Sequence, residues 1–329
     1  MKYRKLGKTE IKVSEISLGC WTMGGPNWNE GNPIGWKDVN EQEIKEAVDY
    51  AVDKGVNHFD NADVYGNGKA ERMLAHVLGN KINDVVIATK VGWFQGTASH
   101  AYEPAHIRSQ CEQSLRNLKR DFIDLYYFHH PYFGENNSLL EDAVDVMNRL
   151  KSEGKIRAIG QSAYTNEDFE KVIPVVKPDV LQSFANAIDD HFLADGTPVR
   201  KMLEEKKMSF VAFGPLAQGL LLDKYSAKNP PQFEKGDHRA NAKRFSKENL
   251  EILDRKMVKI KEKFGSGVEE LSRMALQYLL YYKVVGAVIP GFRNLKQVKI
   301  NLNAADNPLT EEEFNFVKNI FESSGLSYN

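Results

Sequence analysis

FDNADVYG, residues 59–66, joins a short apolar run to a segment with helical period. The run Val56–Phe59 is typical of a buried strand, and Lys69–Leu78 carries its apolar residues at the spacing of a helix. The turn between them opens on a carboxylate, Asp60, and closes on Tyr65 and a glycine. A strand followed directly by a helix is the repeating unit of α/β proteins, so this stretch predicts the fold class.

The same unit recurs along the chain. Short runs rich in β-branched or aromatic residues predict strands at Ile16–Leu18, Val56–Phe59, Val85–Thr89, Phe122–Phe128, Ile156–Gly160, Val180–Ser183, Phe210–Phe213 and Val285–Ile289. Helical periods alternate with them at Glu41–Lys54, Lys69–Leu78, Pro104–Leu118, Ser138–Ser152, Glu167–Val175, Val199–Lys206, Val268–Leu280 and Asn294–Ala304. Eight such strands satisfy every sheet edge by closing into a (β/α)8 TIM barrel, which is the predicted fold. An open doubly wound sheet is the alternative, because periodicity alone does not establish closure.

Three further segments complete the expected architecture. Residues Met1–Val13 predict a β-hairpin that plugs the bottom of the barrel, and the long segments Gly24–Asp38 and Gly214–Phe245 each follow a strand. Loops that follow strands lie on the C-terminal face of a barrel, where barrel active sites form, so both are expected to be irregular binding loops. No linker-like segment divides the chain, and residues 1–329 are expected to form one domain.

The composition argues against several classes of function. The 44 Lys and Arg residues balance 45 Asp and Glu residues, so no overall basic field recruits nucleic acid or an anionic membrane. No apolar stretch approaches the roughly 18 residues of a membrane span, and the N-terminus lacks the apolar segment of a signal peptide. The two cysteines have no metal-ligand spacing, which favours a reducing cytoplasm.

Polar residues end five consecutive predicted strands: Asp60, Lys90, His129, Ser162 and Gln182. In a barrel these ends converge on one mouth, where buried charges are costly unless they are paired. The natural pair is Asp60 with Lys90, from neighbouring strands, and the loop after Asp60 can fold the Tyr65 hydroxyl over them.

This arrangement predicts reduction of a carbonyl group. A nearby cation is expected to lower the pKa of Tyr65 and make it a better proton donor, while His129 orients the carbonyl oxygen. Protonating a carbonyl oxygen suits hydride transfer, which requires a nicotinamide cofactor. A Rossmann site is disfavoured, because Glu71 replaces the third glycine of the fingerprint that Gly66 would begin. The adjacent histidines of HHP (129–131) have no third ligand at suitable spacing, so no metal is expected.

A series of motifs then identifies a family. In chain order they are KYRKLGKTEIKVSEISLGCW (2–21), FDNADVYG (59–66), ATK (88–90), LYYFHHP (125–131), IGQS (159–162), PLAQGLL (215–221) and IPGFRNLKQVKIN (289–301). Over nearly its whole length the sequence resembles the aldo-keto reductases. Within them it looks most like the bacterial group of inositol-linked and sugar-related reductases, and their relatives the potassium-channel β subunits.

The resemblance implies roles for named residues. Tyr65 would be the acid, Lys90 the modulator of its pKa, Asp60 the partner of the lysine, and His129 the group that orients the carbonyl. NADPH would lie extended across the barrel mouth, against Cys20, Trp21, Ser162, Gln182, Phe213, Gly214, Pro215, Leu216, Arg239, Gly291, Arg293, Gln297 and Asn301. A guanidinium binds phosphate in a bidentate manner, so Arg293 beside the adenosine 2′-phosphate favours NADPH over NADH. The expected walls of the substrate pocket are Trp28, Trp93, His130 and Tyr132.

Two other classes of function compete with this interpretation. The first is a nucleotide-binding redox sensor or scaffold that resembles the channel β subunits and turns over slowly. The second is an aldolase or isomerase with Lys90 as a Schiff base, which is disfavoured because Asp60 would keep the lysine charged. Ala163 and Ile300 depart from the family pattern at positions near the cofactor. The natural substrate and the oligomeric state are left open by the sequence.

Overall fold

The computed structural model describes residues 1–29, 31–36, 39–233, 242–322 and 326. Its centre is a parallel sheet in the order β12-β11-β10-β9-β8-β7-β6-β3. The strands are β3 (Leu18–Gly19), β6 (His58–Asp60), β7 (Val86–Val91), β8 (Ile123–Phe128), β9 (Ile156–Ser162), β10 (Val180–Phe184), β11 (Ser209–Phe213) and β12 (Val285–Ile289). Parallel bridges from Ile16 to Val288 and from Gly19 to Gly291 join the two ends of the sheet. The predicted barrel is confirmed, and the open sheet is wrong.

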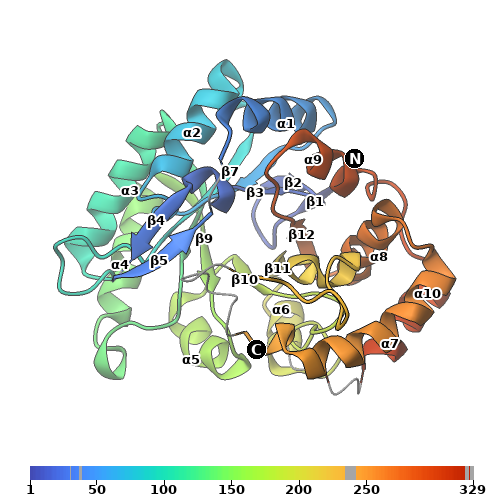
Figure 1. Ribbon diagram of the computed structural model, residues 1–329. Coiled ribbons are helices and arrows are strands. Elements are labelled where there is room, and N and C mark those ends of the chain that lie inside the picture. The colour runs from blue at the N-terminus through green and yellow to red at the C-terminus, as the bar shows by residue number, and fades with distance from the viewer. Residues whose placement is uncertain (30, 37–38, 234–241, 323–325, 327–329) are drawn as a thin grey trace.

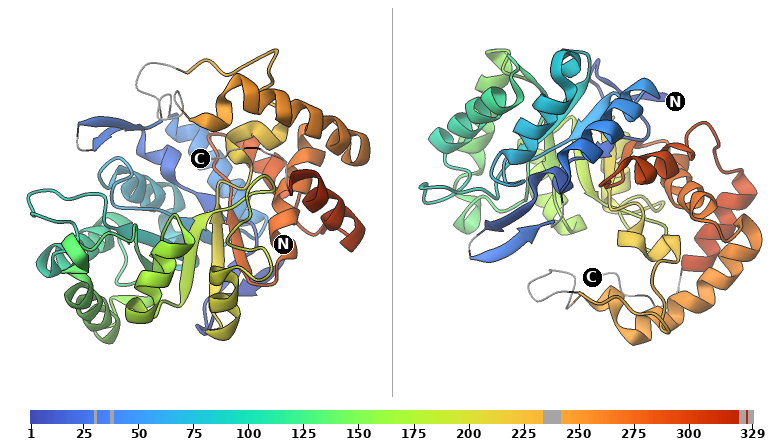
Figure 2. Two further views of the ribbon diagram at one scale, coloured as in Figure 1. Left: turned by 90° about the horizontal axis from the view of Figure 1, so that it is seen from below. Right: turned by 45° about the horizontal axis from the view of Figure 1, so that its top comes forward.

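Helices surround the barrel on the outside (Figures 1 and 2). They are α1 (Glu41–Asp53), α2 (Lys69–Leu78), α3 (Pro104–Leu118), α4 (Leu140–Ser152), α5 (Asn166–Val176), α6 (Pro198–Glu205), α7 (Lys247–Phe264), α8 (Val268–Tyr281), α9 (Leu295–Leu302) and α10 (Glu311–Phe321). All eight predicted helices are present within a few residues of their expected ends. Helices α7 and α10 were not predicted from the sequence, and they pack against each other on one side of the molecule.

The predicted N-terminal hairpin is confirmed. Strands β1 (Tyr3–Lys5) and β2 (Lys12–Ser14) pair antiparallel. Leu6, Ile11 and Val13 are buried in one apolar cluster with the inward-facing side chains of the barrel strands. This burial fixes the hairpin across the barrel's lower end.

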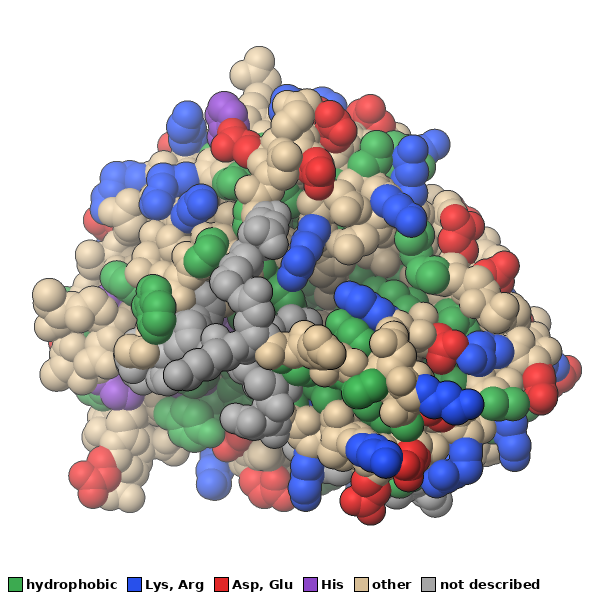
Figure 3. Space-filling model, in the orientation of Figure 1, with side chains coloured by type: hydrophobic (Ala, Val, Ile, Leu, Met, Phe, Trp, Pro, Cys, Tyr) green, Lys and Arg blue, Asp and Glu red, His purple; other side chains and the backbone are tan. Residues whose placement is uncertain are grey.

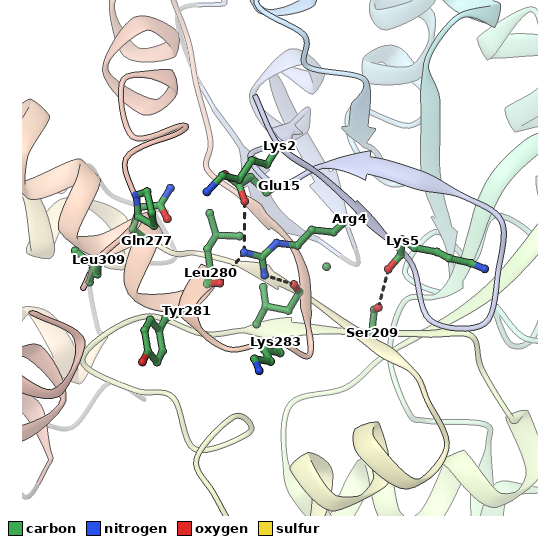
Figure 4. A pocket seen from close by; sticks show the side chains of 13 residues that line it. Lys2, Arg4, Lys5, Glu15, Ser209, Gln277, Leu280, Tyr281, Lys283 and Leu309 are labelled. Atoms are coloured by element: carbon green, nitrogen blue, oxygen red, sulfur yellow. Dashed lines mark hydrogen bonds and ion pairs between the residues drawn. The ribbon is translucent and has the colours of Figure 1, made fainter. Parts of the chain in front are cut away.

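A cavity of about 560 Å³ lies beside this hairpin, at the end of the barrel away from the predicted site (Figure 4). The Arg4 guanidinium points across it and donates hydrogen bonds to the carbonyl oxygens of Leu280 (2.7 Å) and Val285 (2.9 Å). Arg4 also reaches Glu15, at 3.4 Å. These contacts tie the hairpin to the end of α8, where cations stabilise unpaired helix carbonyls.

The loop after β3 is more regular than expected. It begins with a 3₁₀ turn, η1 (Trp21–Gly24), and continues as an antiparallel pair, β4 (Pro26–Asn29) and β5 (Asn32–Gly35). The expectation of an irregular segment is therefore wrong here. The other 3₁₀ turns are η2 (Gly79–Asn83), η3 (Glu135–Asn137), η4 (Ala217–Leu222) and η5 (Lys243–Phe245). Within the described ranges, every helix is too short or too polar to cross a bilayer.

Candidate active site

A buried ion pair lies at the mouth of the barrel. Lys90, on β7, donates hydrogen bonds to the Asp60 carboxylate (2.5 Å) and to the Asn61 carbonyl oxygen (2.6 Å). The second Asp60 oxygen accepts a hydrogen bond from the Gln182 side chain at 2.7 Å. The Lys90 and Asp60 side chains are only 1% and 5% exposed, so their charges depend on each other. The predicted pairing of strand ends is therefore present.

Tyr65 lies directly above this pair. The Lys90 ammonium is 5.3 Å from the centre of the tyrosine ring, and the Trp21 ring stacks on the same ring with the two centres 6.0 Å apart. The expected lowering of its pKa is wrong for this structure. Burial, and then the Asp60 carboxylate, raise the pKa of Tyr65 well above its ordinary value of 10.0. Desolvation is the larger of these two causes, because it disfavours the charged phenolate, and so the phenol stays protonated.

His129 borders Tyr65 on the side of the fourth strand. The two ring centres are 6.0 Å apart and nearly perpendicular. Its backbone N–H donates to the Val91 carbonyl at 2.9 Å, which holds the residue at the strand end. Burial, and then Lys90, lower the pKa of His129 well below 6.5, so the ring is neutral at physiological pH. A neutral imidazole keeps one N–H to offer an oxygen atom.

The predicted pocket residues differ in how close they come to this centre. Trp93 lies beside both histidines, with ring centres 6.3 Å from His129 and 4.6 Å from His130. His130 is buried and engaged by the backbone, because its Nε2 bonds the Gly92 carbonyl oxygen at 2.9 Å. Tyr132 and Trp28 are 56% and 65% exposed. Trp93 is therefore the member of the set in ring contact with His129.

Three buried histidines are expected to stay neutral as the pH falls. Burial lowers the pKa of His58 and His130 to about 4, and that of His129 well below 6.5. Since the folded-state values are depressed, acid below pH 6.5 protonates these rings more readily in the unfolded chain and so favours unfolding. Histidine side-chain NMR, assigned by substitution, should show no titration of the three rings between about pH 8 and pH 5.5. Midpoints near the ordinary value would contradict the burial described here.

The residues predicted to bind the nicotinamide end surround the same mouth. Ser162 ends β9, whereas Gln182 lies in the middle of β10 and not at its end as expected; the two are buried and pair in register. The Gln182 amide donates to Asp60, a hydrogen bond that the sequence did not predict. Cys20 is buried, and its N–H donates to the Asp60 carbonyl oxygen. Phe213 ends β11 half-buried, followed by Gly214, Pro215 and Leu216 in the turn that leads to η4.

The residues predicted for the phosphate end follow β12. Arg293 is exposed, and its backbone N–H donates to the Gln297 side chain at 2.8 Å. Asn301 is buried and its amide approaches the Gly291 carbonyl oxygen at 3.5 Å, so these residues also order the loop itself. Arg239 lies outside the described residues. Figure 3 shows a hollow on this face, with basic side chains beside it.

Two aromatic residues near the mouth were not singled out from the sequence. Trp36 packs edge-on against Trp21 at 5.4 Å and lies under the Arg293 guanidinium. Tyr164 lies close enough to Tyr65 to affect its pKa, and beside Trp93. Tyr164 comes two residues after the end of β9, just beyond the strand-end position that singled out Ser162. Among the side chains that the structure describes, no group of three or more His, Cys, Asp or Glu could hold a metal ion.

Comparison with known proteins places this geometry in a family. The model of the aldo/keto reductase family matches residues 15–322. The uncharacterized oxidoreductase YqkF of Bacillus subtilis is 30% identical, over 95% of this chain and 94% of that protein. A probable voltage-gated potassium channel subunit β of Arabidopsis thaliana is 27% identical, over 93% and 92%. A solved glycerol dehydrogenase of Gluconobacter oxydans is 27% identical and superposes with a TM-score of 0.79, covering 97% of this chain and 94% of that one. The chain therefore belongs to the aldo/keto reductase family of oxidoreductases.

Proposed function

We propose that this oxidoreductase uses NADPH to reduce aldehydes and ketones to alcohols, with Tyr65 as the general acid. The observation that carries the proposal is the Lys90–Asp60 pair, buried directly beneath Tyr65. Because Lys90 is held charged by Asp60, it is unsuited to Schiff-base chemistry, which needs a neutral amine. The alternative of an aldolase or isomerase is disfavoured on the same ground.

The side chains of the mouth have distinct tasks in this proposal. When bound, NADPH would supply the hydride that reduces the carbonyl carbon. Tyr65 stays protonated at neutral pH because burial raises its pKa, and it gives its proton to the carbonyl oxygen as negative charge develops there. An alkoxide is a much stronger base than a phenolate, so the transfer is favourable. His129, neutral in this environment, donates a hydrogen bond that orients the same oxygen.

The residues present fit a phosphorylated dinucleotide. Arg293 forms no ion pair with a carboxylate among the described residues, so its guanidinium can bind a 2′-phosphate. Ser162 and the remaining polar atoms of Gln182 would hold the carboxamide, and the Phe213 ring would cover the nicotinamide. Trp21 and Cys20 would border the ribose. Gln297 and Asn301 would contact the adenine.

Small polar carbonyl compounds, including those derived from sugars, are the proposed substrates. The similarity to a glycerol dehydrogenase supports a polyhydroxylated skeleton. The aromatic walls supplied by Trp93 and Tyr164 suit the apolar C–H faces of such compounds, and His130 and Tyr132 would shape the rim.

The decisive experiment mixes the purified protein with NADPH and a panel of aldehydes that includes 4-nitrobenzaldehyde and small sugar aldehydes. Consumption of the reduced cofactor, followed by its absorbance, is expected with at least one aldehyde and not with the Tyr65→Phe variant. Absence of turnover with every aldehyde of the panel, or full activity of the Tyr65→Phe variant, would refute the proposal.

A redox sensor or scaffold is the second candidate, and the similarity to a channel β subunit favours it. In this case the protein would retain its nucleotide through purification and transfer hydride very slowly. Single-turnover kinetics of the nucleotide-loaded protein separate the two candidates, because a reductase completes turnover rapidly with its substrate and a sensor does not.

A further inference from the structure

The first and last loops of the barrel mouth contact each other. Trp36 follows β5 in the first loop, and Arg293 follows β12 in the last. The Arg293 guanidinium carbon lies 4.8 Å from the centre of the Trp36 ring. This distance is within the range of an attractive cation–π interaction, for which tryptophan is the best ring.

A ring face can hold a guanidinium without consuming its hydrogen-bond donors. Arginine carries five N–H groups in one plane, and all of them point outward from its edge. In the part of the chain that the structure describes, no carboxylate forms an ion pair with Arg293. Contact with Trp36 therefore restricts a flexible cation and still leaves its edge available to an anion.

The position of Trp36 is itself fixed by the first loop. Its backbone N–H donates to the Gly25 carbonyl oxygen at 3.2 Å. Gly35, just before it, has a φ of +91°, and a Cβ atom there would lie 2.2 Å from that same oxygen. The Trp36 ring also packs edge-on against Trp21, which stacks on Tyr65. A continuous series of ring contacts thus connects Tyr65 to the exposed Arg293.

We propose that Trp36 is a positioning residue for Arg293, and that it strengthens recognition of a nucleotide 2′-phosphate. The inference rests on the proposed use of NADPH. Arginine side chains lose considerable rotamer freedom when they bind a ligand, and ordering them beforehand reduces that loss. Preference for a 2′-phosphorylated cofactor would then depend on the first loop of the barrel as well as on the loop before α9.

The test compares two probes that differ only in the 2′-phosphate, adenosine 2′,5′-bisphosphate and adenosine 5′-monophosphate, by isothermal titration calorimetry. Trp36→Leu is expected to lower the affinity for the bisphosphate by about two- to fivefold, which is the equivalent of one exposed cation–π contact. The affinity for the monophosphate is expected to stay unchanged. Trp36→Phe keeps a ring and is expected to restore most of the preference. Arg293→Ala should remove the preference altogether.

Tyr50→Leu is the matched control. Tyr50 on α1 makes a neighbouring cation–π contact with Lys299 of α9, at 5.3 Å, and touches neither Trp36 nor Arg293 in any contact described here. It is expected to leave both affinities unchanged.

The outcomes separate this inference from the function on which it rests. If Trp36→Leu lowered the affinity for both probes equally, the ratio of the two affinities would not change. That result would overturn the role of Trp36 and leave the proposed use of NADPH intact. An unchanged ratio of the two affinities in Arg293→Ala would overturn the roles of both Arg293 and Trp36 in phosphate recognition. A lower ratio of bisphosphate to monophosphate affinity in Trp36→Leu, which Trp36→Phe largely restores, would support the inference.

Discussion

Replacing Tyr65 by phenylalanine is expected to lower kcat by about 10²–10⁴-fold, the usual contribution of a positioned general acid. The ring would remain stacked on Trp21 and above the Lys90 ammonium, because neither contact involves the hydroxyl group. Only the proton donor is removed. The measurement is steady-state reduction of an aldehyde from the active panel, with nucleotide affinity measured separately by fluorescence titration.

The loss should appear in kcat and kcat/KM together, since the hydroxyl acts in the transition state. Tyr281→Phe is a matched control, because Tyr281 is exposed at the end of α8 and its ring stacks on Phe314. It should retain full activity. A Tyr65→Phe enzyme within threefold of the parent would remove Tyr65 from the proposed mechanism.

Replacing Asp60 by asparagine is expected to reduce the free energy of unfolding by about 3–5 kcal/mol, because it leaves the Lys90 charge buried without its partner. Gln182 would also lose the charged carboxylate that accepts its hydrogen bond. Denaturant unfolding of the protein without nucleotide measures the effect directly. Activity should fall as well, since the ammonium beneath Tyr65 would be displaced or neutralised.

An exposed ion pair of the same length supplies the control. Lys263 and Glu312 are also 2.5 Å apart, but their side chains are 36% and 79% exposed. Glu312→Gln should therefore cost about 0–1 kcal/mol. Removing both buried charges in Asp60→Asn with Lys90→Met should be less destabilising than the single change. Equal effects of Asp60→Asn and Glu312→Gln would show that burial does not govern the Lys90–Asp60 pair.

The barrel and the cluster of polar side chains at its mouth could be predicted because both follow from local patterns. Parallel strands end at one face, so Asp60, Lys90 and His129 had to converge there once the strands were found. The missed helix α7 also carried a signal, since Leu250, Leu253, Met257 and Ile260 recur at helical spacing and are buried. Its many charged residues obscured that pattern.

Other features depend on three-dimensional context that no local pattern contains. The pKa of Tyr65 is raised by burial and by the Asp60 carboxylate, and no local sequence pattern shows how deeply a side chain is buried. The hydrogen bond from Gln182 to Asp60 and the stacking of Arg293 on Trp36 join segments far apart in the chain. The β4–β5 hairpin shows no apolar alternation, because its Trp28 faces solvent.

The way the sheet closes has a consequence for the newly made protein. Its seam joins Ile16 and Gly19, near the N-terminus, to Val288 and Gly291, near the C-terminus. Cys20 and Trp21 lie directly after one side of the seam, and Arg293 lies directly after the other. Under the proposed function, a chain emerging from the ribosome would therefore carry its proposed catalytic side chains long before it could complete the nucleotide site. Binding of the proposed nucleotide would then require that the last strand has docked against the first.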